Sequence, residues 1–522
     1  MLTRLKVNGF KNLVDVDISF GPFTCVAGVN GVGKSNLFDA ITFLGALAEK
    51  RLIDAALSVR SEGGRARNIF YRAGSRYVGE MTFEAEMLIP ESGVDDLGQE
   101  AKAAITFLRY AIALGMEGTS LTIRREELSH ITLGKASGHL RFPHSTAWRQ
   151  SVVKGRRTSP FISTSTKDGI TYIRLHQDQG KDYKGGGRPH DYVANKLPRT
   201  VLSEANSADS ATAVLARREM QSWRLLQLEP SGLRKEDDFL APRSLAMNGA
   251  HLPATLARLT RVNTHPGIVP RAVVQVSEVR EGGVLQPESE EAQSQESEED
   301  QAAIYARVAN RLAELIEGVK SVRLDVDERR ELLTLMLTER DGTEYEARSL
   351  SDGTLRFLAL AVLESDSEAR GVLCMEEPEN GIHPQRIPAM LRLLRDLAVD
   401  PTIAVNEDNA MRQVIVNTHS PMVAAQVDEG SLLLAMPQAA RVMDHWGTIA
   451  TFRWLPGTWR AAAFPEVPAV PLGELVSYLN PLEYSDSSSG EERPKTSQRR
   501  RGGPSRVLDR EDLQLLLPLP RP

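Results

Sequence analysis

The alternation of apolar and polar positions predicts strands and one prominent helix in the N-terminal part of the chain. Residues 2–7, 14–20 and 23–27 are short apolar runs typical of strands, and the third leads through a glycine-rich loop into a helix starting near Lys34. Three longer alternating runs follow the helix, over residues 78–88, 104–114 and 121–131. Because no helices lie between these three runs, they predict an antiparallel β subdomain.

Beyond residue 320 the pattern changes to alternating helices and strands. A hairpin is expected at residues 341–342, where Asp-Gly separates two strand-like runs. Helices are expected over residues 355–363 and 384–397, and strands over residues 371–375 and 413–417. This alternation predicts a parallel sheet. The expected fold class is therefore α/β, with a parallel core sheet and an antiparallel β subdomain.

The segment between these two halves predicts an insertion of helices and irregular loops. Helices are expected near residues 213–228 and 252–261. Residues 286–301 are acidic and poor in apolar side chains, which predicts a solvated linker, and the tail is rich in Ser, Glu, Arg and Pro, which predicts disorder. The expected parts are an N-terminal half, the insertion, a C-terminal half and the tail: residues 1–132, 133–320, 321–484 and 485–522.

Composition narrows the class of protein. The 522 residues are 41% hydrophobic and carry 63 basic against 69 acidic side chains, a formal charge of −6. This balance argues against a surface covered in nucleic-acid-binding charge, although it allows local basic grooves. Cys25 and Cys374 lie in apolar runs and are expected to be reduced core thiols. No uninterrupted apolar run of 18 residues occurs, so we expect no membrane span and a cytoplasmic location.

The segment GVNGVGKS, residues 28–35, matches the phosphate-binding pattern G-x-x-x-x-G-K-[ST] (Walker A) in full. It lies between an apolar strand and a helix, where backbone N–H groups and the helix N-terminus attract phosphate. Lys34 is predicted to reach the β- and γ-phosphates, and the Ser35 hydroxyl to hold Mg²⁺. The candidate ATP-binding residues are Asn30, Gly31, Gly33, Lys34, Ser35 and Asn36.

Two carboxylates end the apolar run at residues 372–375. Because parallel sheets bind ligands at the carboxyl ends of their strands, Glu376 and Glu377 are expected beside the phosphate loop. Glu376 is a candidate Mg²⁺ ligand acting through water, since Mg²⁺ keeps several waters. Glu377 is the candidate for orienting or deprotonating the attacking water. Alone, such a pair is typical of a solvated helix start; the phosphate loop favours the functional interpretation.

Two further stretches carry candidate chemistry. The strand over residues 413–417 ends at Thr418, His419 and Ser420. A histidine at a strand end is ordinarily a polar loop residue, but beside the other two strands His419 would face the γ-phosphate or the attacking water. The stretch LSDGT, residues 350–354, holds more capping groups than one helix requires. Its donors are therefore predicted to serve a group outside their own helix.

These motifs, in this order, resemble the ABC-type ATPase superfamily, whose signature motif LSGGQ corresponds to LSDGT. The segments LKVNGFKNL, SLSDGTLRFL, EEPENGIHP and NTHSP are similar to the RecF/SMC-like branch, and within it to bacterial AAA_21 ATPases related to the OLD family. The resemblance implies an ATPase that uses ATP and Mg²⁺ and forms a head-to-tail homodimer. It also implies that the signature residues Ser351, Asp352 and Gly353 face the γ-phosphate bound by the other subunit, with Glu377 and His419 as catalytic groups.

Three features depart from the family pattern. Glu376 stands where the acidic strand end usually has Asp, which puts the metal geometry in question. No glutamine is assigned to the family's Q-loop, whose region corresponds to residues 68–76. No D-x-D pattern follows His419, so the TOPRIM nuclease domain of OLD-family proteins is expected to be absent.

Three functions agree with these motifs. The first is an ATP-dependent switch in DNA maintenance or antiphage defence, working as a homodimer or higher assembly with a separate effector, such as a nuclease or toxin, and with DNA as a candidate partner. The second is the ATPase subunit of an ABC transporter, against which the long insertion and the missing coupling glutamine argue. The third is an ATP-binding scaffold with negligible turnover, which the intact Lys34, Glu377 and His419 disfavour.

Overall fold

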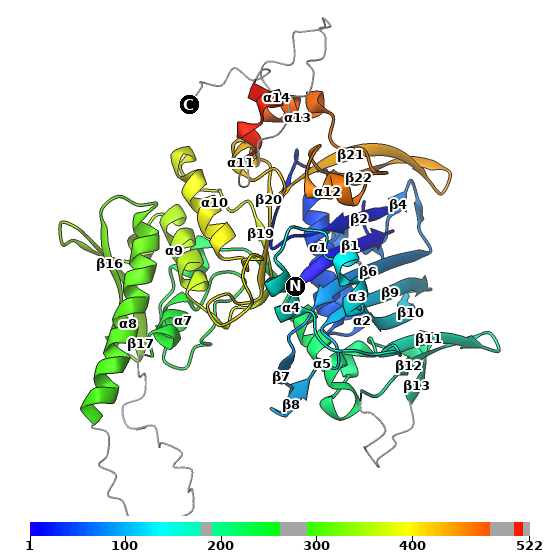
Figure 1. Cartoon of the computed structure of the whole chain (residues 1–522), viewed down its shortest axis with the longest axis horizontal. Coiled ribbons are helices and arrows are strands. Elements are labelled where there is room, and N and C mark those ends of the chain that lie inside the picture. Colours follow the sequence, from blue (N-terminus) through cyan, green and yellow to red (C-terminus); the bar gives the residue numbers. More distant parts are fainter. Residues whose placement is uncertain (179–189, 262–289, 481–505, 515–522) are drawn as a thin grey trace, which may run out of the picture. The chain divides into compact units, whose positions relative to one another are not determined.

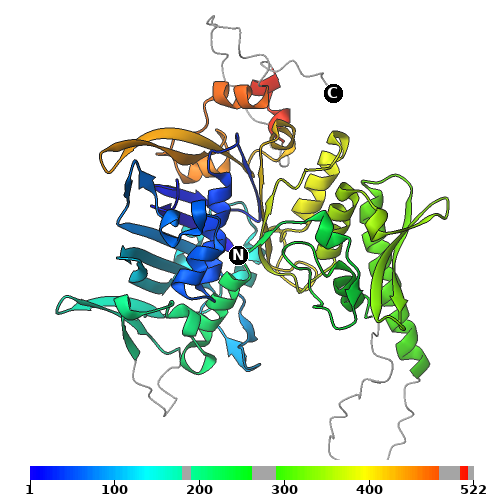
Figure 2. The same cartoon turned by 180° about the vertical axis from the view of Figure 1, so that it is seen from behind.

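The structure is a computed structural model that describes residues 1–178, 190–261, 290–480 and 506–514 (Figures 1 and 2). Its contacts divide the chain into two compact units. The first comprises Met1–Leu225, Arg370–Glu379 and Leu394–Pro522, and the second Leu226–Ala369 and Asn380–Leu393. This differs from the expected division, because the first part of the expected insertion, residues 133–225, belongs to the first unit.

An eight-stranded antiparallel sheet forms one part of the first unit. The alternating runs expected near its centre are strands, and three strands of the expected insertion extend the same sheet through β10–β11 pairing. The strands of this sheet follow one another in the order β13-β12-β11-β10-β9-β6-β1-β2. The bounds of these strands are β1 Leu2–Asn8, β2 Val16–Ser19, β6 Glu80–Leu88, β9 Phe107–Glu117, β10 Ser120–His130, β11 Ile162–Lys167, β12 Ile170–Leu175 and β13 His190–Val193.

A six-stranded sheet forms the other part, in the order β14-β19-β20-β3-β21-β22. The four central strands run parallel, as expected from the alternation of helices and strands, and β22 is antiparallel at the edge. The chain is therefore a mixed α/β protein with a parallel core sheet and an antiparallel sheet. The bounds are β3 Phe23–Ala27, β14 Arg224–Leu226, β19 Gly371–Glu376, β20 Arg412–Thr418, β21 Leu432–Val442 and β22 His445–Arg453.

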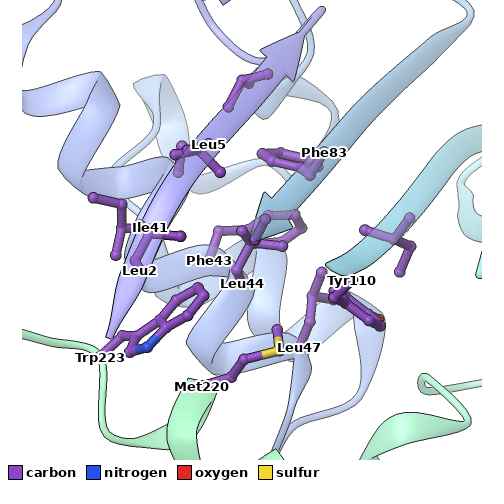
Figure 3. Packing of buried hydrophobic residues seen from close by; sticks show 14 of the residues in the cluster. Leu2, Leu5, Ile41, Phe43, Leu44, Leu47, Phe83, Tyr110, Met220 and Trp223 are labelled. Atoms are coloured by element: carbon purple, nitrogen blue, oxygen red, sulfur yellow. The ribbon is translucent and has the colours of Figure 1, made fainter. Parts of the chain in front are cut away.

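Helix α1, Lys34–Leu47, joins the two sheets through one hydrophobic cluster that contains residues of the helix and of both sheets. Figure 3 shows Phe43 and Leu44 of α1 grouped with Leu2, Leu5 and Phe83 of the antiparallel sheet. The rings of Phe43 and Phe83 lie 5.5 Å apart, a separation at which aromatic pairs stabilise each other. This packing fixes the start of α1, and with it the phosphate loop, relative to both sheets. Cys25 and Cys374 are buried free thiols, as expected.

The second unit contains a small antiparallel sheet flanked by helices. Strands β16, Val319–Asp327, and β17, Leu332–Glu339, form a hairpin, and β18, Glu344–Glu346, pairs with β17 across the expected Asp-Gly turn. Helix α9 is held to helix α8 by the Arg311–Glu364 ion pair at 2.5 Å. The bounds of the principal helices here are α7 Leu252–Leu259, α8 Glu290–Ala313 and α9 Asp352–Glu364.

Smaller elements complete the described residues. The bounds of these helices are α2 Leu52–Ser58, α3 Leu133–His139, α4 Thr146–Val152, α5 Ser207–Gln221, α6 Pro230–Leu233, α10 Ile387–Asp396, α11 Pro421–Gln426, α12 Trp459–Ala463, α13 Leu472–Leu479 and α14 Glu511–Gln514. The short strands are β4 Arg72–Ala73, β5 Arg76–Tyr77, β7 Ser92–Val94, β8 Glu100–Lys102 and β15 Asp237–Asp238. Of the described helices, none combines the length and apolar character needed to cross a bilayer.

Two expectations based on composition were wrong in part. The acidic stretch expected to be a linker is helical from Glu290, because Glu, Gln and Ala are strong helix formers and continue directly into the rest of α8; residues 286–289 lie outside the described residues. The expected disordered tail contains an ordered segment, residues 506–514. Its apolar side chains Val507 and Leu513 are fully buried, and the Val507 amide donates to the Val427 carbonyl at 3.0 Å. The rest of the tail lies outside the described residues.

Glu126 is a fully buried carboxyl on β10. It accepts hydrogen bonds from the backbone N–H groups of Val201 and Leu202, at 2.8 and 2.9 Å, and from the Tyr110 hydroxyl at 3.2 Å. Burial raises the pKa of Glu126 from 4.5 to about 7, although these hydrogen bonds oppose the shift.

This shift predicts a pH dependence of folding stability. The folded protein holds the Glu126 proton more tightly than the unfolded chain, so the resulting stability is full below pH 4.5 and is lost as the pH rises to about 7. The difference between a pKa of 4.5 and one of about 7 corresponds to about 3 kcal/mol in the free energy of unfolding. In Glu126→Gln the free energy of unfolding, measured with urea at several pH values, should lose this dependence. Glu127→Gln, which changes the half-buried neighbour, is the matched control; an unchanged pH dependence in Glu126→Gln would contradict the prediction.

Candidate nucleotide-binding site

The phosphate loop connects β3 to α1 and contains two glycines in left-handed conformations. Gly31 and Gly33 have φ values of 77° and 115°, a left-handed conformation that favours glycine. At Gly33 space also requires glycine, because a Cβ would lie 2.6 Å from the Asn12 Oδ1 atom. No side chain caps the N-terminus of this 14-residue helix. Its first N–H groups are therefore suited to an anion.

Lys34 lies at this helix start and is only 6% exposed. Its Nζ atom donates to the carbonyl oxygens of Gly28 and Val29, at 2.6 and 2.9 Å. Burial lowers the pKa of Lys34, while the carboxylates of Glu377, Glu379 and Glu376 act in the opposite direction. The ammonium group of Lys34 therefore lies inside the loop, where it contacts two carbonyl oxygens, and the negative charges of the three glutamates favour its charged form.

Asn12 supports the loop from outside and was not among the predicted residues. Its side-chain amide donates to the Val32 carbonyl at 3.0 Å and accepts from Asn36 at 2.8 Å. The predicted residue Asn36 thus braces the loop, whereas Asn30 is exposed at its tip. Asn12 precedes the loop by 16 residues, in a turn within the segment LKVNGFKNL, and the resemblance of that segment to the RecF/SMC-like branch did not by itself assign Asn12 a role.

The strand ends bring the acidic and histidine motifs to the phosphate loop. In the parallel sheet Glu376 pairs with Asn417, and Thr418 pairs with Ala27, the last residue of β3. The Gly28 N–H donates to the Thr418 carbonyl at 3.3 Å. Strand β20 lies between β19 and β3, and the three strands run parallel. Their carboxyl ends therefore lie together along one edge of the sheet, at the strand ends, as the sequence predicted.

Glu377 and His419 meet at this edge. The Nδ1 atom of His419 lies 2.7 Å from the Glu377 Oε1 atom, and the side chains are 43% and 32% exposed. Glu377 has a φ of 46°, a left-handed conformation that is strained for a residue with a side chain. Its N–H donates to the Asn417 carbonyl at 3.0 Å, which holds this turn. Strained residues of this kind concentrate at functional sites.

Arg60 is the main residue of this site that sequence reasoning missed. Its guanidinium donates to both carboxylate oxygens of Glu376, at 2.8 and 3.0 Å. It also contacts Asp39 of α1 at 3.0 Å, and Asp39 in turn pairs with Lys11 at 2.5 Å. No motif marks Arg60, because 316 residues separate it from Glu376 in the sequence.

Glu379 is a second residue of interest at the edge, with only 8% of its surface exposed. The Thr418 hydroxyl donates to its Oε1 atom, and burial raises the pKa of the Glu379 carboxyl. Its Oε2 atom has no hydrogen-bond partner among the described residues. A buried and incompletely paired carboxyl is typical of functional positions.

The residues present fit a magnesium ion of the kind that accompanies nucleotides. Among the described residues, no three His, Cys, Asp or Glu side chains form a metal-binding group. Mg²⁺ in nucleotide sites needs only one or two protein oxygens, since phosphate and water supply the others. Ser35 and Glu376 offer a hydroxyl and a carboxylate, and Glu376 already holds a cation, the Arg60 guanidinium. One nitrogen of Arg60 touches both the Ser35 carbonyl, at 3.4 Å, and Glu376, at 3.0 Å, so the two candidate ligands are near each other.

The signature residues lie in the second unit, at the start of α9. Ser351 is the N-cap, and its hydroxyl accepts from the Thr354 N–H at 3.2 Å. Asp352 pairs with Arg234 at 2.5 Å, and a Cβ at Gly353 would lie 2.5 Å from the Gly381 carbonyl. The close approach of Gly381 therefore explains why a glycine stands at position 353, and the Asp352 carboxylate is already engaged in an ion pair. Ser351 and Asp352 are both exposed.

Comparison with known proteins gives a family match to part of the chain. Residues 197–425 match the AAA_21 family, described as "AAA domain, putative AbiEii toxin, Type IV TA system". The matched range contains the signature residues, the glutamate pair and His419, and the phosphate loop precedes it. No curated protein matched the chain significantly.

The solved structures that match this chain include SMC head domains. One, an SMC head bound to the C-winged helix domain of ScpA, is 13% identical, covers 87% of this chain and 98% of its own, and has a TM-score of 0.43. The SMC head domain from Thermotoga maritima is 11% identical, with coverages of 87% and 98% and a TM-score of 0.35. A third, from Pyrococcus yayanosii, is 12% identical, with coverages of 89% and 99% and a TM-score of 0.38.

These TM-scores lie below 0.5, so the assignment depends on the family match and on the residues of the site. The strand–loop–helix geometry of residues 23–47 is that of a P-loop. The AAA_21 match over residues 197–425, together with the phosphate loop that precedes it, supports a P-loop ATPase similar to the AAA_21 family.

Proposed function

We propose that this protein hydrolyses ATP and uses the cycle of binding and hydrolysis as a switch. The observation that carries the proposal is the contact of Glu377 with His419 at 2.7 Å, at the sheet edge where the phosphate loop begins. A carboxylate in this position is suited to orient a water molecule and accept its proton. His419, hydrogen-bonded to that carboxylate, is suited to hold the γ-phosphate or the same water.

The remaining residues of the site have distinct roles in this proposal. The N–H groups of residues 30–35 cradle the phosphates, and Lys34 exchanges its contacts with the loop carbonyls for the β- and γ-phosphates. Ser35 and Glu376 would hold Mg²⁺, which neutralises phosphate charge when bound. Positioning and electrostatic stabilisation supply most of the catalysis in phosphoryl transfer, so no covalent intermediate is required.

A head-to-tail homodimer would complete the site. Ser351 is exposed at the N-terminus of a 13-residue helix, and such an N-terminus attracts negative charge. We propose that it faces the γ-phosphate bound by a second copy of the chain. ATP would then close the dimer, and hydrolysis would open it.

For the biological role, we propose a cytoplasmic switch in antiphage defence or DNA maintenance, acting with a separate effector such as a nuclease or toxin. The description of the matched family, which names a toxin of a type IV toxin–antitoxin system, supports defence. DNA remains a candidate partner.

The first experiment compares ATP hydrolysis by the wild type and by Lys34→Ala with Mg²⁺ present. We expect steady turnover in the wild type and loss of nucleotide binding in Lys34→Ala, because the variant lacks the ammonium group that contacts the phosphates. Wild-type turnover in Lys34→Ala would contradict the assignment of the site.

A second experiment adds duplex DNA to the wild-type protein at increasing salt concentration. A salt-sensitive rise in the rate of ATP hydrolysis would support a role in DNA maintenance.

A further inference from the structure

Arg60 engages the carboxylate of Glu376, one of the two residues proposed to hold Mg²⁺. The segment that carries Arg60 follows α2, and its guanidinium forms a two-pronged pair with the carboxylate, with distances of 2.8 and 3.0 Å. Both oxygens of Glu376 are therefore engaged. Two-pronged pairs of this kind add geometric specificity to the charge attraction.

The same guanidinium is tied to the phosphate-loop helix. Its Nε atom lies 3.0 Å from the Asp39 Oδ1 atom, and its Nη2 atom lies 3.4 Å from the Ser35 carbonyl. Asp39 is nearly buried and is also paired with Lys11. Arg60 thus lies between the two candidate magnesium ligands and is anchored by a third residue that is not one of them.

A guanidinium and a magnesium ion cannot both use the same face of one carboxylate. Mg²⁺, bound directly or through one of its waters, needs a lone pair of the Glu376 carboxylate, and the two-pronged Arg60 pair engages both oxygens of that carboxylate. The pair is open to solvent, since the Arg60 side chain is 46% exposed, and exposed ion pairs are readily broken. The side chain of glutamate is one methylene longer than that of aspartate. This extra length helps the carboxylate at position 376 to reach Arg60, which is a reason for glutamate where the family pattern has aspartate.

We propose that Arg60 is a positioning residue that competes with Mg²⁺ for Glu376, so that metal–nucleotide loading requires the guanidinium to be released. This inference rests on the proposed function. The Asp39 contact keeps the released side chain beside the phosphate loop, where its charge favours bound phosphate. Arg60 thereby holds the empty site closed to free metal ions and opens it when nucleotide and metal arrive together.

The test measures the Mg²⁺ concentration at half-maximal binding of a fluorescent ATP analogue, in a Glu377→Gln background that prevents turnover. Arg60→Ala should lower this concentration by at least about threefold, the size expected for loss of a partly exposed ion pair. Arg60→Lys should give an intermediate value, because lysine offers a point charge without the fork. Arg65→Ala, which removes an exposed arginine of the same segment, should leave the value unchanged.

A second readout separates competition from a structural role. Mn²⁺ binding without nucleotide, followed by electron paramagnetic resonance, should be weak in the wild type and stronger in Arg60→Ala. In a Glu376→Gln background, Arg60→Ala should have no further effect on metal binding, since the shared ligand is gone. If Arg60→Ala fails to fold, Arg60→Gln replaces it in both measurements.

The possible failures are distinct. An unchanged or raised Mg²⁺ requirement in the Arg60 variants, with nucleotide still bound, overturns the competition and leaves the proposed function intact. No nucleotide binding by the Glu377→Gln protein at any Mg²⁺ concentration overturns the proposed function, and this inference with it.

Discussion

Glu377→Gln should bind ATP normally and hydrolyse it about 10²–10⁴ times more slowly than the wild type, the usual contribution of a general base. The physical reason is that the amide keeps the size of the side chain and its hydrogen bond with His419 but cannot accept a proton from water. The measurement pairs a steady-state ATPase assay with nucleotide binding. Glu407→Gln, a change at an exposed glutamate of the same unit, is the control.

The same variant also tests dimer formation. If ATP closes the dimer and hydrolysis opens it, Glu377→Gln should accumulate as a dimer with ATP and as a smaller species with ADP. Light scattering after size-exclusion chromatography distinguishes the two. Normal turnover in Glu377→Gln would show that another group serves as the base.

Ser351→Arg should abolish hydrolysis while leaving nucleotide binding intact. The variant keeps its own phosphate loop, but the bulky side chain would block the N-terminus of α9 from the γ-phosphate of the other subunit. Ser349→Arg makes the same chemical change two residues earlier, at another exposed serine, and should be much less harmful. Hydrolysis and nucleotide binding are measured on all three proteins.

Mixing Ser351→Arg with Lys34→Ala protein tests contact between subunits directly. Random exchange puts half of the chains in mixed dimers, each with one site built from two intact halves, so activity should recover to at most about one quarter of the wild type. Wild-type activity in Ser351→Arg alone would exclude a role in trans for the signature residues.

Local sequence was sufficient where the chemistry is local. The run of residues 28–35 determines its own loop, because glycine adopts the required left-handed conformations without strain, and the apolar runs around it determine a strand and a helix. The strand ends at Glu376 and Thr418 were predictable for a similar reason, since buried parallel strands are continuous apolar runs.

Average composition was a poorer guide to which segments are ordered. The acidic residues from Glu290 form part of α8, in line with the helix propensity of Glu, Gln and Ala, and Val507 and Leu513 bury their side chains within a tail that composition marked as disordered. Two apolar residues in a polar segment carry little weight in an average over the sequence. They contribute to docking of residues 506–514, together with polar contacts such as the Arg510–Glu429 ion pair at 2.9 Å, and only the fold supplies the partners for both.

The sequence by itself determined that this protein has a nucleotide-binding loop, an acidic strand end and a histidine strand end, because each depends on neighbouring residues. Only the tertiary structure decided that Arg60 holds Glu376, that Asp39 holds Arg60, and that Asn12 braces the loop. The reason is physical: an ion pair depends on distance in space, and chain positions 316 residues apart share no local pattern that records it.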